Sequence, residues 1–210
     1  MGFLLTMSRW IDAINDRVGR FVSWAILLAV VVAVFNAFGR KFMHAGSNAW
    51  IELQWYLFGA LFLLSSGYTL LKNGHVRVDV LSSRLAKRTQ MWIEVIGTVF
   101  FLLPMALVIM WLGWPMFWES WQTQEMSSNA GGLIRWPAKL MVPVGFCLLI
   151  AAALSHLVKA IAFLQGRGPD PTRRETAVSE EEALAEELRA RLAAEAAGGA
   201  ASPAPGARKP

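Results

Sequence analysis

The stretch that decides the fold is residues 21–38, FVSWAILLAVVVAVFNAF, which contains no charged residue. The hydrocarbon core of a bilayer is about 30 Å thick, and a helix of roughly 17–25 apolar residues crosses it. Three further apolar stretches of this length follow, at about residues 51–71, 91–111 and 140–163. The sequence therefore predicts an all-α integral membrane protein with four transmembrane helices.

Composition supports a membrane protein over a soluble one. Hydrophobic residues make up 55% of the 210 residues, charged residues make up 17%, and the mean hydropathy is +0.42. Soluble domains carry about 25% charged residues. The first stretch is too long for the core of a signal peptide, and Gly39, Arg40 and Lys41 follow it instead of a cleavage site, so we expect it to be retained.

The distribution of Lys and Arg predicts the orientation. Twelve lie in the N-terminal flank, the loop after the second stretch and the near C-terminal flank, whereas four lie in the other two loops. Cytoplasmic loops carry the excess of positive charge, so both termini should be cytoplasmic and residues 39–50 and 112–138 should face outward. This placement explains the net charge of +5 by contact with membrane lipid, and it argues against binding of nucleic acid.

Two segments lie outside the predicted four-helix domain, which spans residues 21–165. Residues 1–20 place apolar side chains on one helical face and charged ones on the others, which predicts an N-terminal interfacial amphipathic helix. Residues 166–210 predict a cytoplasmic tail. Its Ala-, Glu- and Arg-rich part should be partly helical, and its end, rich in Ala, Gly and Pro, should be disordered.

Glu52 and Glu94 are the carboxylates within the predicted spans, and a charge inside the membrane is costly. They lie near opposite ends of their helices, so they form no catalytic pair. We expect each to make an ion pair at its helix end or to contact another subunit. Arg40 or Lys41 is the expected partner of Glu52, and Arg84, Lys87 or Arg88 that of Glu94. A role in ion coupling is the alternative.

The remaining motifs point to no enzyme, metal site or cofactor. His44, His75 and His156 lie in different segments without metal-binding spacing, and the single cysteine, Cys147, forms no intrachain disulfide. Phosphate-binding and nucleophile motifs are absent from the sequence. Two alternative interpretations stay open: a self-contained four-helix exporter using Glu52 or Glu94, and a membrane redox subunit using His156.

Four motifs resemble one family of membrane subunits. They are NAWIELQWYLF at 48–58, NGHVRVDV at 73–80, SSNAGGLIRWP at 127–137 and PVGF at 143–146. Their order and spacing resemble the small permease subunit, of DctQ type, of tripartite ATP-independent periplasmic (TRAP) transporters. The mannitol/chloroaromatic-type branch looks most similar, and the resemblance covers about residues 10–165.

This resemblance implies a function that the residues alone do not. Such a subunit scaffolds a large permease subunit in sodium-coupled uptake of an organic acid or related solute, which a periplasmic substrate-binding protein delivers. By motif match, the implied candidates for subunit contacts are Glu52, Gln54, Arg77, Asp79, Asn129, Gly131, Gly132 and Arg135.

Overall fold

The computed structural model describes residues 2–42, 47–72, 85–166 and 187–189. The chain divides into two compact units, Met1–Pro171 and Thr172–Pro210. In the second unit, residues 187–189 form an exposed helical turn. The first unit is built from helices α1 (Gly2–Phe42), α2 (Asn48–Leu64), α3 (Ser66–Leu71), α5 (Lys87–Gly97), the π-helical turn η1 (Thr98–Leu102), α6 (Leu103–Gln122) and α7 (Trp136–Leu164).

Helix α1 is one continuous helix of 41 residues. At a rise of 1.5 Å per residue it is about 61 Å long, twice the thickness of a bilayer core. Residues 2–20 are helical, as the sequence indicated, but they form the first half of this helix and not a separate element. Gly19 lies within this helix, and its missing side chain makes room for the ring of Tyr68.

The second predicted stretch is broken at Ser65, between α2 and α3. The Ser65 and Ser66 hydroxyls donate hydrogen bonds to the carbonyl oxygens of Leu61 and Leu63. Serine side chains that bond to the preceding turn compete with the backbone ladder and bend helices. The break leaves a helix of 17 residues followed by one of six.

The third predicted stretch changes its winding just before Pro104. Proline has no N–H, and its ring collides with the carbonyl four residues earlier. The chain forms the π-helical turn Thr98–Leu102, in which Leu103 N donates to Thr98 O, and then continues as α6. The disturbance before Pro104 is therefore a local widening of the helix. Helix α6 runs on to Gln122, so Trp111, Trp114, Trp118 and Trp121 all lie on it.

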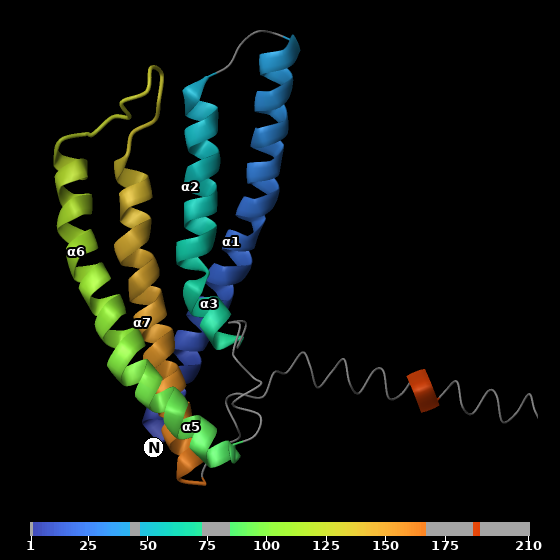
Figure 1. The fold of residues 1–210 in the computed structure, drawn as a ribbon, viewed down its shortest axis with the longest axis vertical. Helices are drawn as coiled ribbons and strands as arrows, with labels where there is room; N and C mark the ends of the chain where they lie inside the picture. The colour runs from blue at the N-terminus through green and yellow to red at the C-terminus, as the bar shows by residue number, and fades with distance from the viewer. Residues whose placement is uncertain (1, 43–46, 73–84, 167–186, 190–210) are drawn as a thin grey trace, which may run out of the picture. The chain divides into compact units, whose positions relative to one another are not determined.

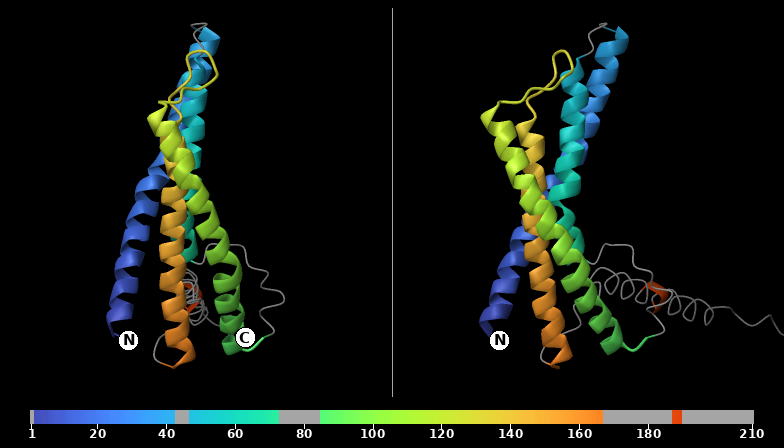
Figure 2. Two further views of the ribbon diagram at one scale, coloured as in Figure 1. Left: turned by 90° about the vertical axis from the view of Figure 1, so that its left-hand side faces the viewer. Right: turned by 60° about the vertical axis from the view of Figure 1, so that its left-hand side comes forward.

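The helices of the first unit pack as two antiparallel pairs joined along their lower halves. Figures 1 and 2 show α1 beside α2 and α6 beside α7, while the N-terminal half of α1 lies along α7. Helix α3 fills the junction, where it contacts both α1 and α7. The start of α2 and the connection between α6 and α7 lie at the same end, drawn uppermost in Figure 1.

Small residues mediate the closest helix contacts. A Cβ on Gly145 would lie 2.6 Å from the carbonyl oxygen of Leu63, and one on Gly67 would lie 2.1 Å from Asn15 Oδ1. The buried residues of α7 are all small or ring-closed: Pro143, Gly145, Ala152, Ala153, Ser155, Ala160 and Ala162. Membrane helices associate through such small residues, because burying large apolar side chains gains little when the solvent is itself apolar.

Large apolar side chains are exposed. Phe21 is 80% exposed on α1, and Phe62 on α2 is 79% exposed. Within the described residues, three helical segments are long and apolar enough to cross a membrane: Leu4–Phe42, Lys87–Gln122 and Trp136–Leu164. The all-α prediction and three of its apolar helices are confirmed. Because of the break at Ser65, the stretch at 51–71 is not among those three, and its crossing remains a prediction.

Polar contacts join α1 to α7 at the lower end. The buried hydroxyls of Ser8 and Ser155 lie 2.6 Å apart, and Ser155 Oγ donates to Asp12 Oδ1 at 2.6 Å. Asp12 also pairs with Lys159 of α7. Nearby in α7, His156 Nε2 lies 3.2 Å from Glu94 Oε2 on α5, so Glu94 has a histidine partner that the sequence did not indicate.

The packing at Gly145 predicts a loss of stability on adding one methyl group. Overpacking a tight contact costs about 1–3 kcal/mol, and here the obstacle is backbone that cannot rotate away. We expect Gly145→Ala to lower the unfolding temperature in detergent, followed by tryptophan fluorescence. Gly59→Ala is the matched control, since a Cβ on Gly59 meets nothing within 4 Å. Equal melting of the two variants would contradict the close approach of α7 to Leu63.

Candidate functional site

The connection between α6 and α7, residues 123–135, is named here the strap. It begins where Gln124 turns the chain with a φ of 48° after the last turn of α6. Met126 and Ile134 then pair as an isolated antiparallel bridge, and Ser127 N donates to Leu133 O at 3.0 Å. The strap is therefore a hairpin-like loop with its own backbone hydrogen bonds.

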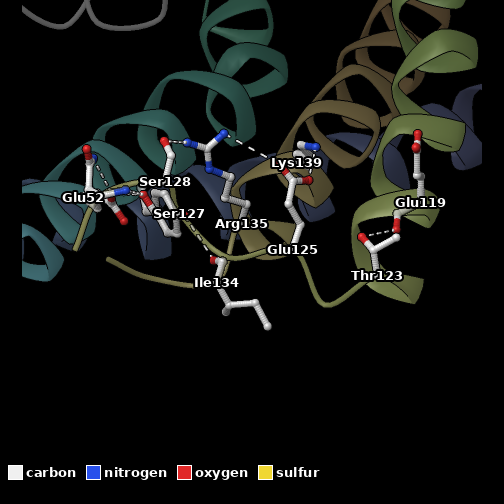
Figure 3. A network of polar contacts seen from close by, with 11 residues as sticks. Glu52, Glu119, Thr123, Glu125, Ser127, Ser128, Ile134, Arg135 and Lys139 are labelled. Atoms are coloured by element: carbon white, nitrogen blue, oxygen red, sulfur yellow. Dashed lines mark hydrogen bonds and ion pairs between the residues drawn. The ribbon is translucent and has the colours of Figure 1, made fainter. Parts of the chain in front are cut away.

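The strap wraps the carboxylate of Glu52, which lies in the first turns of α2 (Figure 3). Glu52 Oε1 accepts hydrogen bonds from Ser127 Oγ and from Asn129 Nδ2, the latter at 2.9 Å. Glu52 Oε2 accepts from the backbone N–H of Leu133 at 2.7 Å. Glu52 as a residue is only 7% exposed, and each oxygen has a donor. A buried carboxylate with several donors is stabilised as an anion and fixes the groups around it.

Two adjacent glycines make this arrangement possible for different reasons. Gly131 has a φ of +70°, a left-handed conformation that costs glycine nothing, and open space surrounds it. Gly132 is required for space, because a Cβ there would lie 2.5 Å from the Cβ of Ser127 and 2.8 Å from Glu52 Oε1. The Gly-Gly pair therefore lets the strap turn and then approach the carboxylate closely.

Two further hydrogen bonds attach the strap to α2. Asn48 Nδ2 donates to the carbonyl oxygen of Ala130 at 3.0 Å, and Tyr56 Oη donates to that of Ile134 at 3.1 Å. Asn48, Glu52 and Tyr56 are spaced four residues apart, so they share one face of the helix. Side chains on one face of α2 thus bond to the strap along the segment that leads back to α7.

A second carboxylate, Glu125, ties the strap to the start of α7. It pairs with Lys139 and lies 3.6 Å from Arg135 Nη1, and Arg135 Nη2 donates to Ser128 Oγ at 3.3 Å. Figure 3 shows Arg135 lying between Ser128 and Glu125. The hydrogen bond from Lys139, with the charge of Arg135 adding to it, lowers the pKa of Glu125 below its usual value. The rings of Trp121 and Trp136 meet edge to face with centroids 4.5 Å apart, closing the base of the strap.

This geometry is that of a brace. The acceptors of Glu52 are used by donors of the same chain, and the carboxylate of Glu125 is neutralised by two cations. Among the described residues, no three His, Cys, Asp or Glu side chains are grouped so as to hold a metal ion. The hydrogen bonds and ion pairs of the site therefore hold the exposed turn at residues 128–131 in one conformation.

The structure brings five of the eight predicted site residues together in this brace: Glu52, Asn129, Gly131, Gly132 and Arg135. The expected partners of Glu52, Arg40 and Lys41, are not the ones it uses. Gln54 is half-buried on α2 and takes no part in the hydrogen bonds of the strap. Arg77 and Asp79 lie outside the described residues, as does Arg84, one of the expected partners of Glu94.

Several residues of the brace were not predicted from the sequence. Ser127, Asn48 and Tyr56 contribute through single hydroxyl or amide groups, and Leu133 contributes only its backbone. The signal that could have found them is the spacing of the polar residues 48, 52 and 56, four residues apart on a mostly apolar helix. It indicates a face that meets polar groups and not lipid.

The comparison with known proteins decides the family. Residues 10–163 match the family described as Tripartite ATP-independent periplasmic transporters, DctQ component. The chain belongs to the DctQ family. The match includes all the described helices of the first unit apart from the first turns of α1 and the last residue of α7, together with the whole strap. Neither a curated protein nor a solved structure matches the chain.

Membership confirms the predicted family and makes this DctQ protein a multi-pass membrane component of a TRAP transporter, and not an enzyme. The described polar clusters therefore belong to a transporter subunit. The Glu94–His156 contact links α5 to α7 of this subunit.

Replacing the central carboxylate predicts a local loosening of the strap. In Glu52→Gln, an NH₂ group replaces one carboxylate oxygen, so a donor then faces the donors of the strap. Because hydrogen bonds to a charged group are the stronger ones, the amide of Leu133 should exchange roughly 10- to 100-fold faster. Hydrogen–deuterium exchange of the strap peptide measures this. Glu119→Gln, at an exposed carboxylate of α6, is the matched control, and unchanged exchange in Glu52→Gln would contradict the brace.

The lowered pKa of Glu125 predicts that the strap loses its protection from hydrogen exchange at acid pH. A carboxyl whose folded pKa is lowered stabilises the fold fully above its ordinary pKa of 4.5 and loses this contribution as the pH falls through the lowered value. In Lys139→Gln the pKa of Glu125 should rise, so strap protection should fail at a higher pH than in the parent chain. Hydrogen–deuterium exchange of the strap is compared between the parent chain and Lys139→Gln at equal pH, between about pH 3 and pH 7. In the control Lys41→Gln, the pH at which half of the protection is lost should be unchanged.

Proposed function

We propose that this DctQ component is a scaffold that holds a large permease subunit in the membrane during sodium-coupled uptake. The solute would be an organic acid or related compound delivered by a periplasmic substrate-binding protein. The single observation that carries the proposal is the family match over residues 10–163. The four motifs quoted from the sequence support placement in the mannitol/chloroaromatic-type branch.

The exposed faces of the helices support a scaffold. Phe100 and Phe101 in η1 and Met105 in α6 form an apolar surface that suits either lipid or another membrane helix. The long-range polar contacts are concentrated at Glu52, which bonds to the strap, and around Ser155, which bonds to α1. A solute pathway through this chain would need polar groups along its length. The distribution favours a partner that carries the solute site.

We further propose four membrane crossings with both termini in the cytoplasm. Helices α2 and α3 together cover residues 48–71, about 36 Å of helix, which is long enough for the fourth crossing. The bias of twelve basic residues against four supports this orientation. In this orientation the strap lies on the periplasmic side, where its exposed turn would face the binding protein.

Reconstitution tests whether this chain transports solute alone or only together with the large subunit and the binding protein. The chain alone in proteoliposomes should give no sodium-driven uptake, whereas the chain with its large subunit and binding protein should transport. Sodium-driven flux from the chain alone would establish the self-contained exporter instead. Co-purification with a large permease subunit measures assembly separately from transport.

Two variants of α2 test separately the exposed turn proposed to face the binding protein and the surface proposed to contact the large subunit. Glu52→Ala should leave co-purification intact but raise the binding-protein concentration needed for half-maximal uptake by about tenfold, because the exposed turn loses its fixed conformation. Gln54→Ala should lower the yield of the assembled pair, since Gln54 is our candidate for contact with the large subunit. Glu119→Ala is the control for both measurements. If Glu52→Ala abolished assembly while the strap kept its protection, Glu52 would itself be an interface residue.

A further inference from the structure

One face of α1 carries two exposed arginines between two exposed tryptophans. Arg17 and Arg20 are three residues apart, Trp10 precedes Arg17 by seven residues, and Trp24 follows Arg20 by four. These spacings place all four on one helical face. Trp10 is 66% and Trp24 is 70% exposed, so this face is directed away from the other described helices.

A third cation, Lys72, follows the end of helix α3 and lies beside this face. Lys72 Nζ lies 3.7 Å from Asp16 Oδ1, and Arg20 pairs with the other oxygen of the same carboxylate. The ammonium of Lys72 also lies 5.9 Å from the ring centre of Tyr68, which packs directly on Gly19. The junction of α1 and α3 thus fixes Lys72 next to Arg20.

The charges in this patch do not cancel. Arg17, Arg20 and Lys72 contribute three positive charges, and Asp16 contributes one negative charge, which leaves a local charge of +2. The side chains of Arg20 and Lys72 remain 70% and 46% exposed despite their contact with Asp16. Both therefore keep hydrogen-bond donors accessible to a further anion.

The patch lies at one border of the apolar part of α1. Arg20 directly precedes the uncharged stretch 21–38, and Arg40 follows it. The 20 residues from one arginine to the other correspond to about 30 Å of helix, the thickness of a hydrocarbon core. The arginines of the patch therefore meet the level at which lipid headgroups begin.

We propose that Arg17, Arg20 and Lys72 bind the phosphate of an anionic phospholipid, whose acyl chains lie along Phe21 and Trp24. Guanidinium groups bind phosphate through paired, charge-assisted hydrogen bonds, and basic pockets between membrane helices bind anionic headgroups. A zwitterionic lipid brings its own ammonium group into a patch that is already positive. The apolar surface that continues from the arginines favours a lipid over an acidic protein segment.

Native mass spectrometry of the full chain released from detergent tests this site. Phosphatidylglycerol should bind more tightly than phosphatidylcholine. In Arg17→Gln/Arg20→Gln the affinity for phosphatidylglycerol should fall about 30-fold, at roughly fivefold per charge near a surface. Arg40→Gln/Lys41→Gln removes the same charge from the other end of α1 and should leave the affinity unchanged.

In Asp16→Asn we expect tighter binding of phosphatidylglycerol, the opposite of the effect of removing the arginines. Removing the carboxylate frees Arg20 and Lys72, so phosphatidylglycerol should bind about fivefold more tightly. Loss of binding in Asp16→Asn would overturn the proposal, because only a structural role of the patch predicts it. Lys72→Gln, with an expected loss of about fivefold, serves as a second variant if the double arginine variant does not fold.

Two controls separate a lipid site from general charge attraction. Glycerol phosphate, the headgroup without its chains, should not displace phosphatidylglycerol at millimolar concentration, since it lacks contact with Phe21 and Trp24. Displacement would show a free-phosphate site and overturn the lipid assignment. Equal loss of binding in Arg40→Gln/Lys41→Gln, or equal affinity for phosphatidylcholine, would overturn the proposal.

Discussion

Lipid offers no hydrogen bonds, so a polar side chain that lies among apolar helices is stabilised by a partner within the protein. Among the described residues, three such side chains find partners in distant elements. Glu52 finds donors in the strap, Ser155 finds Ser8 and Asp12, and Glu94 finds His156. These contacts connect elements that are distant in the sequence. The need to satisfy a few polar groups therefore determines which helices stay together at each end of the first unit.

Between its ends, the structure depends on close backbone approach. Gly145 and Gly67 let α7, α1 and the α2–α3 break come within reach of one another's carbonyl and amide oxygens. Large side chains such as Phe21 and Phe62 are left on the outside. A protein folded in water would bury them, because their burial would then be a main driving force. Here they remain available to lipid and to partner helices, as the proposed scaffold role requires.

The sequence predicted the helices because apolar length and helix geometry are local properties. It also named Glu52, Asn129, Gly131 and Gly132 among eight candidate contact residues, through their resemblance to family motifs. Their relation was not predictable, because it depends on residue 52 meeting residues 127–133 across the fold. The charge-based expectation that Arg40 or Lys41 would pair with Glu52 failed for the same reason. Local charge counting cannot foresee neutral hydroxyl, amide and backbone donors supplied by a loop some 80 residues away.

The pairing of Asp12 with Lys159 has a consequence for membranes of different thickness. Arg20 and Arg40 bound the uncharged part of α1, and Lys139 and Lys159 bound that of α7, each over 20 residues or about 30 Å. Asp12 precedes Arg20 by eight residues, so the two uncharged parts are displaced along the helices by about 12 Å. Inclining the pair reduces this offset along the bilayer normal, and long charged side chains at the borders reach the headgroups over the remainder. A thinner or thicker bilayer would therefore change the inclination of α1 and α7 together.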